Sequence, residues 1–269
     1  MKTLKKNLKS NLDTIDELLK TPRGEFSKST FHKLRVEIKK LNAIFNLINF
    51  CTKDFKRKET FRPFKEVFKQ AGKVRELQLE EDILDQYFST NSLFDYRKRI
   101  NNDLSKEKNS FFELLGKELD RKIAHKMDVL IPFVDQVGKK KAEAFIEKKK
   151  NVIESLISKN SLNTEELHKL RKLLKTLMYS LASISLENEE NIDSEELELT
   201  DLLGDWHDFD IAINKFDKAL ISNEIEPNEA KEIEEVKIKI SLERDLLLKK
   251  IEQSIPLSKF YHKTGFGNS

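Results

Sequence analysis

The sequence contains one motif twice, and this repeat constrains the fold more than any other feature. Residues 31–41 (FHKLRVEIKKL) align without gaps with residues 167–177 (LHKLRKLLKTL). A second motif follows each copy, AGKVRELQ at 71–78 and LGDWHDFD at 203–210. The two pairs match in the same order at offsets of 136 and 132 residues. We therefore predict a duplication and two related halves.

Apolar residues recur at three- and four-residue spacing along nearly the whole chain, which is typical of amphipathic helices. Strand-like alternation is absent, and the 269 residues include only 7 Gly and 5 Pro. These features predict an all-α fold. The predicted helices span residues 2–20, 28–51, 57–89, 92–130, 138–159, 163–186, 193–221 and 227–254.

Three local signals indicate where helices end or begin. The segment 21–24 (TPRG) ends the first helix. Pro132 is expected to interrupt the middle of the chain, because proline lacks an amide donor and clashes with the preceding turn. Asn163 is a predicted N-cap, and the acidic residues at 165–166 suit the first turn of a helix.

The net charge of +3 hides an asymmetry between the two parts of the chain. Residues 1–140 carry ten more basic than acidic side chains, and residues 141–269 carry seven more acidic than basic ones. A basic half favours a phosphate-bearing partner or an anionic surface.

The single cysteine, Cys51, cannot form an intramolecular disulfide and is expected to be a buried apolar residue. No apolar run is long enough for a membrane span, so we expect a cytoplasmic protein.

Each copy of the first motif places three basic side chains on one side of a helix, within about 60° of one another. They are His32, Arg35 and Lys39 in the first copy and His168, Arg171 and Lys175 in the second. In both copies this basic stripe lies beside the apolar stripe that is expected to face the core. We divide the chain accordingly into halves 1–137 and 138–258, followed by a flexible tail at 259–269.

Like charges at this spacing repel one another by about 0.2–0.5 kcal/mol per pair, so the stripes need a compensating anion. The anion could be internal, because Glu76, Asp208 and Asp210 of the second motif could neutralise the stripes; the protein would then be a helical interaction scaffold. It could also be a phosphate-rich ligand lying between the two halves. Arginine suits such a ligand because its guanidinium donates two hydrogen bonds to phosphate oxygens, and lysine adds a mobile point charge.

The pattern His-x-x-Arg-x-x-x-Lys, followed by Gly-x-x-Arg-acid and repeated in the second half with Leu-Gly-x-x-x-Asp, resembles the CHAD (conserved histidine α-helical domain) family. The resemblance extends from about Ser27 to about Gln253. It implies two pseudo-symmetric four-helix bundles with a basic central groove or pore that binds inorganic polyphosphate, without a cofactor. The implied polyphosphate-binding residues are His32, Arg35, Lys39, Lys69, Arg75, His168, Arg171 and Lys175.

The sequence departs from the family pattern at four positions. Asn42 and Met178 stand where the family commonly has a further arginine. In the second half His207 replaces Arg75, and Asp201 replaces Lys69, by their place in the repeat. We therefore expect a weaker or shorter-reaching anion site whose affinity falls with salt.

Other functional classes have little support in the sequence. Phosphate-loop, dinucleotide-binding and nucleophile-elbow motifs are absent, so we expect no enzyme. Histidines without a cysteine partner or a His-x-x-x-His pair make a poor metal site. A nucleic-acid binder should interleave aromatic residues with cations, whereas Phe31, Phe45, Phe64 and Phe68 lie on apolar faces. We expect a cytoplasmic polyphosphate binder, present at polyphosphate granules where these form.

Overall fold

A computed structural model describes residues 2–89, 92–116, 126–159, 161–185, 194–222 and 225–255, and every regular element in these ranges is helical. The α-helices are α1 (Lys2–Leu19), α2 (Lys28–Cys51), α3 (Arg57–Tyr87), α4 (Phe94–Leu114), α6 (Lys126–Asp135), α7 (Lys139–Ile157), α8 (Thr164–Ile184), α9 (Ser194–Ile221) and α10 (Pro227–Ser254). A short 3-10 helix, Arg23–Glu25, separates α1 from α2. The predicted all-α fold is confirmed.

Side-chain caps fix the start of the two helices that carry the repeated histidine motif. The Ser27 side chain accepts a hydrogen bond from the Thr30 amide at the start of α2. At the start of α8, the Asn163 side chain accepts from the Glu166 amide at 2.9 Å, and the Glu166 carboxylate accepts from the Asn163 amide at 3.1 Å. This reciprocal capping box confirms the predicted N-cap at Asn163.

Two predictions about the middle of the chain are wrong. The helix predicted over 92–130 is not continuous, because α4 ends at Leu114 and residues 115–116 form bends, where Gly116 has a low helix propensity. Pro132 does not interrupt a helix but lies inside α6. Leu130 and Val134 on either side of it are fully buried, so packing outweighs the lost hydrogen bond. The predicted tail, 259–269, lies outside the described residues.

The core is built from the apolar faces of these helices and is rich in phenylalanine in the first half. Phe31, Phe45 and Phe64 are fully buried. The Phe31 ring lies 4.5 Å from the Phe26 ring and 4.9 Å from the Phe111 ring, so α2 and α4 meet through aromatic contacts. Cys51 is buried with them, as its sequence context predicts.

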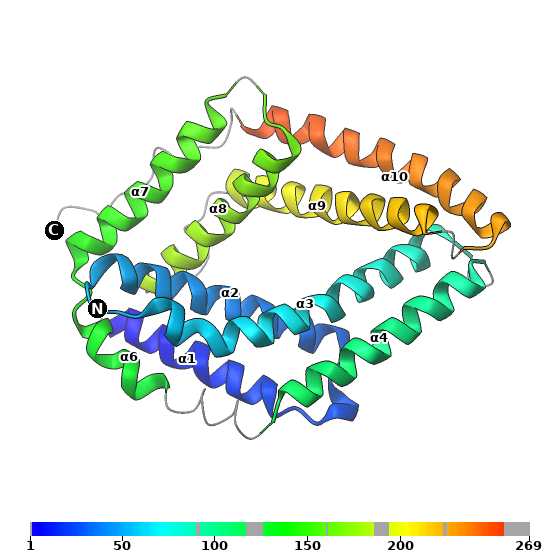
Figure 1. Ribbon diagram of the computed structural model, residues 1–269. Coiled ribbons are helices and arrows are strands. Elements are labelled where there is room, and N and C mark those ends of the chain that lie inside the picture. Colours follow the sequence, from blue (N-terminus) through cyan, green and yellow to red (C-terminus); the bar gives the residue numbers. More distant parts are fainter. Residues whose placement is uncertain are drawn as a thin grey trace.

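Helix contacts within and between the two halves follow one scheme (Figure 1). In the first half, α1 packs on α2, α2 on α3 and α3 on α4; in the second, α7 packs on α8, α8 on α9 and α9 on α10. Between the halves, α2 contacts α8 and α3 contacts α9, while α1 contacts α8 and α7 contacts α2. Such reciprocal contacts are expected when an approximate twofold axis relates two halves. The pseudo-symmetry and the boundary at 137/138, between α6 and α7, stay predictions.

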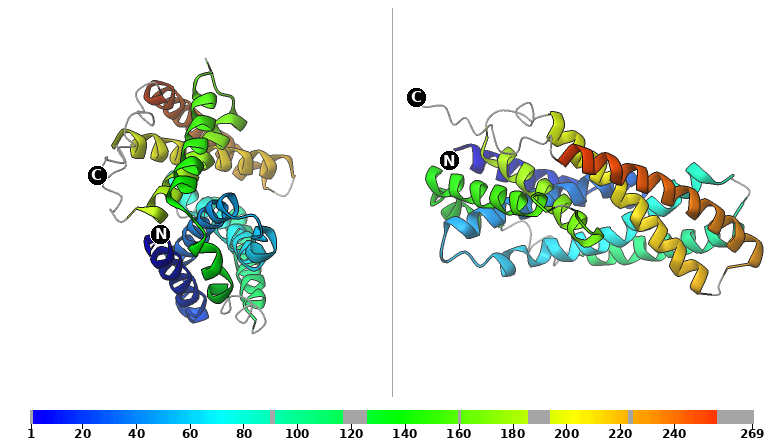
Figure 2. Two further views of the ribbon diagram at one scale, coloured as in Figure 1. Left: turned by 90° about the vertical axis from the view of Figure 1, so that its left-hand side faces the viewer. Right: turned by 90° about the horizontal axis from the view of Figure 1, so that it is seen from above.

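The pairs α3–α4 and α9–α10 form two long helical hairpins that extend along an elongated molecule (Figure 2). Their ends are joined by Glu229, a buried residue of α10. Its carboxylate accepts hydrogen bonds from the amides of Asp95 and Tyr96 at 2.9 and 3.1 Å, and so caps the start of α4. The Tyr87 hydroxyl donates to Glu243 at 2.6 Å and joins α3 to α10. These contacts fix the position of one hairpin relative to the other.

Candidate functional site

The packing of α2 against α8 brings cations from both halves together. The pKa of Lys39 on α2 is lowered, chiefly because the side chain is buried. The positive charge of Arg35 on the same helix lowers this pKa further. Arg171 and Lys175 of α8 add to this effect, and the pKa falls from the ordinary 10.5 to about 8. Since such coupling acts only over short distances, the predicted stripes of the two halves repel one another across this contact.

A cation from α3 joins the same region. His32 is exposed on α2, and its pKa is lowered first by partial burial and then by the charge of Arg75 on α3. Lys175 of α8 also lowers the pKa of His32. Three helices therefore contribute to what we call the basic cluster. Its members are His32, Arg35 and Lys39 of α2, Arg75 of α3, and Arg171 and Lys175 of α8.

Contacts with α3 position the guanidinium of Arg35. Its Nη1 donates to the Phe68 carbonyl oxygen at 2.8 Å, and its Cζ lies 4.2 Å from the centre of the Phe68 ring. Gly72, one turn further along α3, leaves room for this arrangement, because a Cβ atom there would clash with Arg35 Nη1. Arg35 is thus oriented by a carbonyl and a ring, neither of which carries a negative charge.

Arg171, the counterpart of Arg35 in the second half, is placed differently. Apart from the surrounding backbone of α9, no described atom lies within 4 Å of a Cβ built on Gly204, which corresponds to Gly72, so Arg171 does not pack on α9 as Arg35 packs on α3. Its Nε is buried and has no hydrogen-bond partner in the part of the chain that the structure describes. A buried donor without a partner is destabilising, and an anion could satisfy it.

Two carboxylates offset part of the positive charge. Asp82 lies 3.6 Å from Arg75, and it also accepts from Lys28 at 2.7 Å. Asp201 lies 3.9 Å from Lys175 and is largely exposed, so solvent screens this pair. The internal neutralisation that the sequence allowed is present in part, because the predicted acid Asp210 pairs with His168 at 3.1 Å. Asp82 and Asp201, which we had not predicted as partners, offset Arg75 and Lys175.

The centre of the basic cluster keeps its excess of positive charge. Within the described ranges, Arg35, Lys39 and Arg171 form no ion pair with a carboxylate. Asp208 of α9 is partly buried, and its charge acts on Lys39 without a close ion pair. Partial burial raises the pKa of Asp208, although the charge of Arg171 acts in the opposite direction. Glu76 is exposed on α3, where its charge acts on Arg35 without a close contact.

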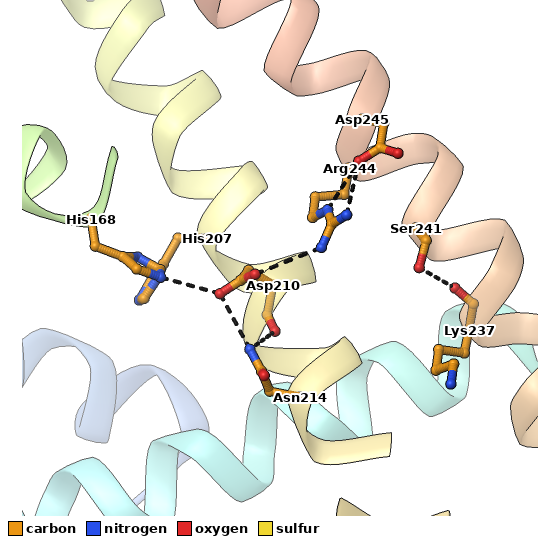
Figure 3. A network of polar contacts seen from close by, with 8 residues as sticks. All are labelled: His168, His207, Asp210, Asn214, Lys237, Ser241, Arg244 and Asp245. Carbon is orange, nitrogen blue, oxygen red and sulfur yellow. Dashed lines mark hydrogen bonds and ion pairs between the residues drawn. The ribbon is translucent and has the colours of Figure 1, made fainter. Parts of the chain in front are cut away.

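His168 has partners that its repeat counterpart His32 lacks (Figure 3). Its Nε2 lies 3.1 Å from Asp210 Oδ2, and its Nδ1 lies 2.9 Å from Nδ1 of His207. Arg244 of α10 lies 3.8 Å from the other oxygen of Asp210. Asp210 and Arg244 therefore connect His168 to α9 and α10. No described hydrogen bond or ion pair joins His168 to a member of the basic cluster.

The protonation of this pair follows from its geometry. Burial, followed by the charge of Arg171, lowers the pKa of His207 to about 3, so His207 is neutral at pH 7. His168 Nε2 faces the Asp210 carboxylate and donates to it, which leaves Nδ1 to accept from His207 when both rings are neutral. The sequence alone indicated His207 only as the replacement of Arg75 in the repeat. The spacing of His207 and Asp210, three residues apart on one helix face, could have indicated its role.

Position 42 lacks a cation in the sequence, yet the fold places one beside it. The Asn42 side-chain oxygen accepts from Arg57 Nη2 at 2.6 Å. Asn42 lies about 60° from Lys39 on the helical wheel, so Arg57 extends the positive charge along α2. Arg57 Nε is buried without a hydrogen-bond partner, as is Arg171 Nε. Sequence reasoning missed Arg57 because it comes from the start of α3.

Lys69 lies on another side of α3 than Arg75. The two residues are six positions apart, which places them about 120° apart around the helix. Lys69 is exposed, and no hydrogen bond or ion pair connects it to another predicted site residue within the described ranges. The inclusion of Lys69 in the site stays a prediction.

The surroundings of the cluster limit its chemistry. A cleft of about 510 Å³ lies between α3, α9 and α10, and it is lined by Asp82, which pairs with Arg75. Most of the other lining residues are acidic or apolar, and Lys250 is the one cation among them. The basic groove or pore thus stays a prediction.

Among the residues that the structure describes, no group of three or more His, Cys, Asp or Glu side chains could hold a metal ion. In the same residues no helix is long and apolar enough to cross a membrane.

Comparisons with known proteins agree on one family. A family model of the CHAD domain matches residues 12–217. The crystal structure of the CHAD domain from the plant Ricinus communis superposes with a TM-score of 0.76 at 12% identity, covering 96% of this chain and 92% of that one. PptA from Streptomyces chartreusis gives a TM-score of 0.73 at 14% identity, covering 94% and 98%. No curated protein sequence matches this chain.

Proposed function

This chain belongs to the CHAD family, and from this premise we propose that it binds inorganic polyphosphate through the basic cluster. Polyphosphate is an unbranched chain of phosphates, each with a negative charge, so one molecule can meet cations from several helices at once. The proposal treats the protein as a binding module without catalytic activity, located in the cytoplasm and at polyphosphate granules where these form.

The observation that carries the proposal is the position of Lys39 among other positively charged side chains. Folding places this lysine, half-buried, among Arg35, Arg171 and Lys175, and no carboxylate pairs with it in the described part of the chain. An arrangement that repels itself is costly to the folded state unless a ligand neutralises it. The unpaired Nε groups of Arg57 and Arg171 add donors that phosphate oxygens would satisfy.

The aromatic residues favour polyphosphate over single-stranded nucleic acid. Binding of single strands usually relies on exposed rings on which bases stack. Phe31, Phe45 and Phe64 are fully buried, and Phe68 lies against the guanidinium of Arg35. The cations of the cluster are thus not interleaved with exposed rings.

A helical interaction scaffold is the alternative function, and two contacts favour it. Asp82 neutralises Arg75, and Asp201 lies near Lys175. In a scaffold of this kind the cations would be structural, so their removal would destabilise the fold. In a ligand site their removal would abolish binding and leave the fold as stable as before or more stable.

The test is a salt titration of binding to long-chain polyphosphate, with duplex DNA and heparin as competitors. For Arg35→Ala/Arg171→Ala we expect a loss of affinity of at least about 100-fold, since hydrogen bonds to charged groups contribute about 1.5–3 kcal/mol each. The salt dependence should also become shallower by about one per lost contact. The control Lys58→Ala/Lys65→Ala removes two exposed charges outside the cluster and should bind nearly as well. Equal binding to all three polyanions, or a double variant that binds normally, would contradict the proposal.

A further inference from the structure

Helix α10 exposes a row of large aliphatic side chains along its outer face. Ile238, Leu242 and Leu246 are 58%, 62% and 57% exposed, although they lie within a well-packed helical hairpin. Their four-residue spacing puts them within about 40° of Leu242 on the helical wheel. The opposite face of α10 packs on α9 through residues such as Ile240 and Ile251, which are fully buried. The outer row, which we call the α10 stripe, is therefore a second apolar face. Leu246 lies at its edge and also lines the cleft between α3, α9 and α10, whereas Ile238 and Leu242 do not line that cleft.

The charges that flank the α10 stripe are arranged symmetrically about Leu242. Glu235 lies seven residues before Leu242 and Lys249 seven residues after it, each about 20° from it around the helix. Both are exposed, and neither forms an ion pair with another described residue. Glu234 and Lys250 form a second pair of opposite charges, each one residue further from Leu242 along the helix. The stripe thus has an acidic N-terminal side and a basic C-terminal side.

We infer that the α10 stripe is the interface of a homodimer in which two copies of α10 pack antiparallel, with Leu242 at the twofold axis. Leu242 then faces its own copy, and Ile238 faces Leu246 of the other copy. In the same register Glu235 of each copy meets Lys249 of the other, so two ion pairs close the ends of the apolar contact. A parallel dimer would instead place Glu235 against Glu235 and Lys249 against Lys249.

The charge pattern decides between a second copy and an unrelated partner. Helix α10 is acidic before Leu242 and basic after it. A second copy of α10 in the reversed direction therefore matches its charges, and no other protein is needed as a partner. Six aliphatic side chains meet in such a dimer, which corresponds to the low end of interface sizes. We expect a reversible dimer with a dissociation constant on the order of 10–100 µM. The dimer does not depend on the proposed polyphosphate binding, because no residue of the basic cluster lies in the α10 stripe.

Sedimentation equilibrium over a range of protein concentrations tests the dimer. The wild type should shift from monomer to dimer, and Leu242→Glu should remain a monomer with unchanged helical content, since position 242 is exposed. Glu235→Lys should weaken association about tenfold or more by placing lysine against Lys249, and the double exchange Glu235→Lys/Lys249→Glu should restore it. Asp103→Lys, an exposed charge reversal on α4, is the matched control and should associate like the wild type.

Disulfide formation tests the register. Leu242→Cys should cross-link two copies under oxidising conditions, whereas Ile238→Cys should not, because position 238 faces position 246. The natural Cys51 is buried and does not interfere. A wild type that stays monomeric, a dimer that tolerates Leu242→Glu, or a double exchange that fails to restore association would each overturn the inference and leave the α10 stripe to another partner.

Discussion

At the scale of single residues, the basic cluster lowers the stability of the free protein. The pKa of Lys39 falls from 10.5 in the unfolded chain to about 8 in the fold, first through burial and then through its cationic neighbours. A lysine with a lowered pKa binds its proton less tightly when folded, so protonation favours unfolding. This destabilisation is complete below about pH 8 and disappears as the pH rises from about 8 to 10.5.

The substitution Lys39→Met should therefore increase stability while it weakens binding. We expect the free energy of unfolding at pH 7 to rise by about 1–3 kcal/mol, and the gain to vanish above about pH 10. Polyphosphate affinity should fall by about tenfold or more. Chemical denaturation at several pH values and a binding titration measure the two effects. Lys33→Met, an exposed position on the same helix, should change neither by a comparable amount.

Binding by the wild type should depend on pH in the same range. A bound polyanion raises the pKa of Lys39, so affinity should decline as the pH rises above about 8. Lys39→Met should lack this decline. If both proteins lose affinity equally between about pH 8 and 9, Lys39 does not contact the ligand.

Helical spacing predicted which residues share a face, but it could not predict partners from other helices. Arg35, Lys39, Arg171 and Lys175 were predicted from spacing within α2 and α8, and they come together because these helices pack on each other. His168 was predicted by the same spacing, yet it is tied to Asp210 of α9. Asp210 was predicted as a possible internal partner of the stripes, but which stripe residue it contacts depends on how α8 packs on α9.

At the scale of helices, the glycine of the second motif has a separate role in each half. Gly72 leaves room for the Arg35 guanidinium, whereas no atom lies close to the corresponding position of Gly204. The repeat in the sequence therefore does not imply equal contacts. The helix ends were predicted within about two residues for most helices, because caps are local signals. The middle of the chain was the exception, because α4 ends at Leu114 instead of residue 130 and Pro132 lies inside α6. The burial of the neighbours of Pro132 is not a local property.

Substitution of the two glycines tests this difference. Gly72→Ala should displace the Arg35 guanidinium and reduce polyphosphate affinity by about 3- to 10-fold. Gly204→Ala should leave affinity unchanged and increase the free energy of unfolding by about 0.5–1 kcal/mol, because alanine favours the helix. A binding titration and thermal unfolding of both variants measure these effects. Equal affinity of the two variants would mean that Arg35 is not oriented for binding.

At the scale of the whole molecule, the proposed site takes residues from both predicted halves, because α2 and α8 contact each other. The first half supplies His32, Arg35, Lys39 and Arg75, and the acidic second half supplies only Arg171 and Lys175. Glu229 caps α4 from α10 and fixes the two hairpins relative to each other, so both halves are held in position before a ligand binds. The duplication predicted this partnership in outline. The sequence explains why the first half supplies more basic residues than the second. The packing of the helices explains why these residues come together.

The most direct test of this account is calorimetric titration of polyphosphate into the wild type and into the single variants Arg35→Ala and Arg171→Ala at one salt concentration. If both halves form one site, each variant should lose affinity by about tenfold or more while the number of protein molecules bound per polyphosphate chain stays the same. If Arg171→Ala binds like the wild type, the second half does not contribute, and the claim of a shared site is wrong.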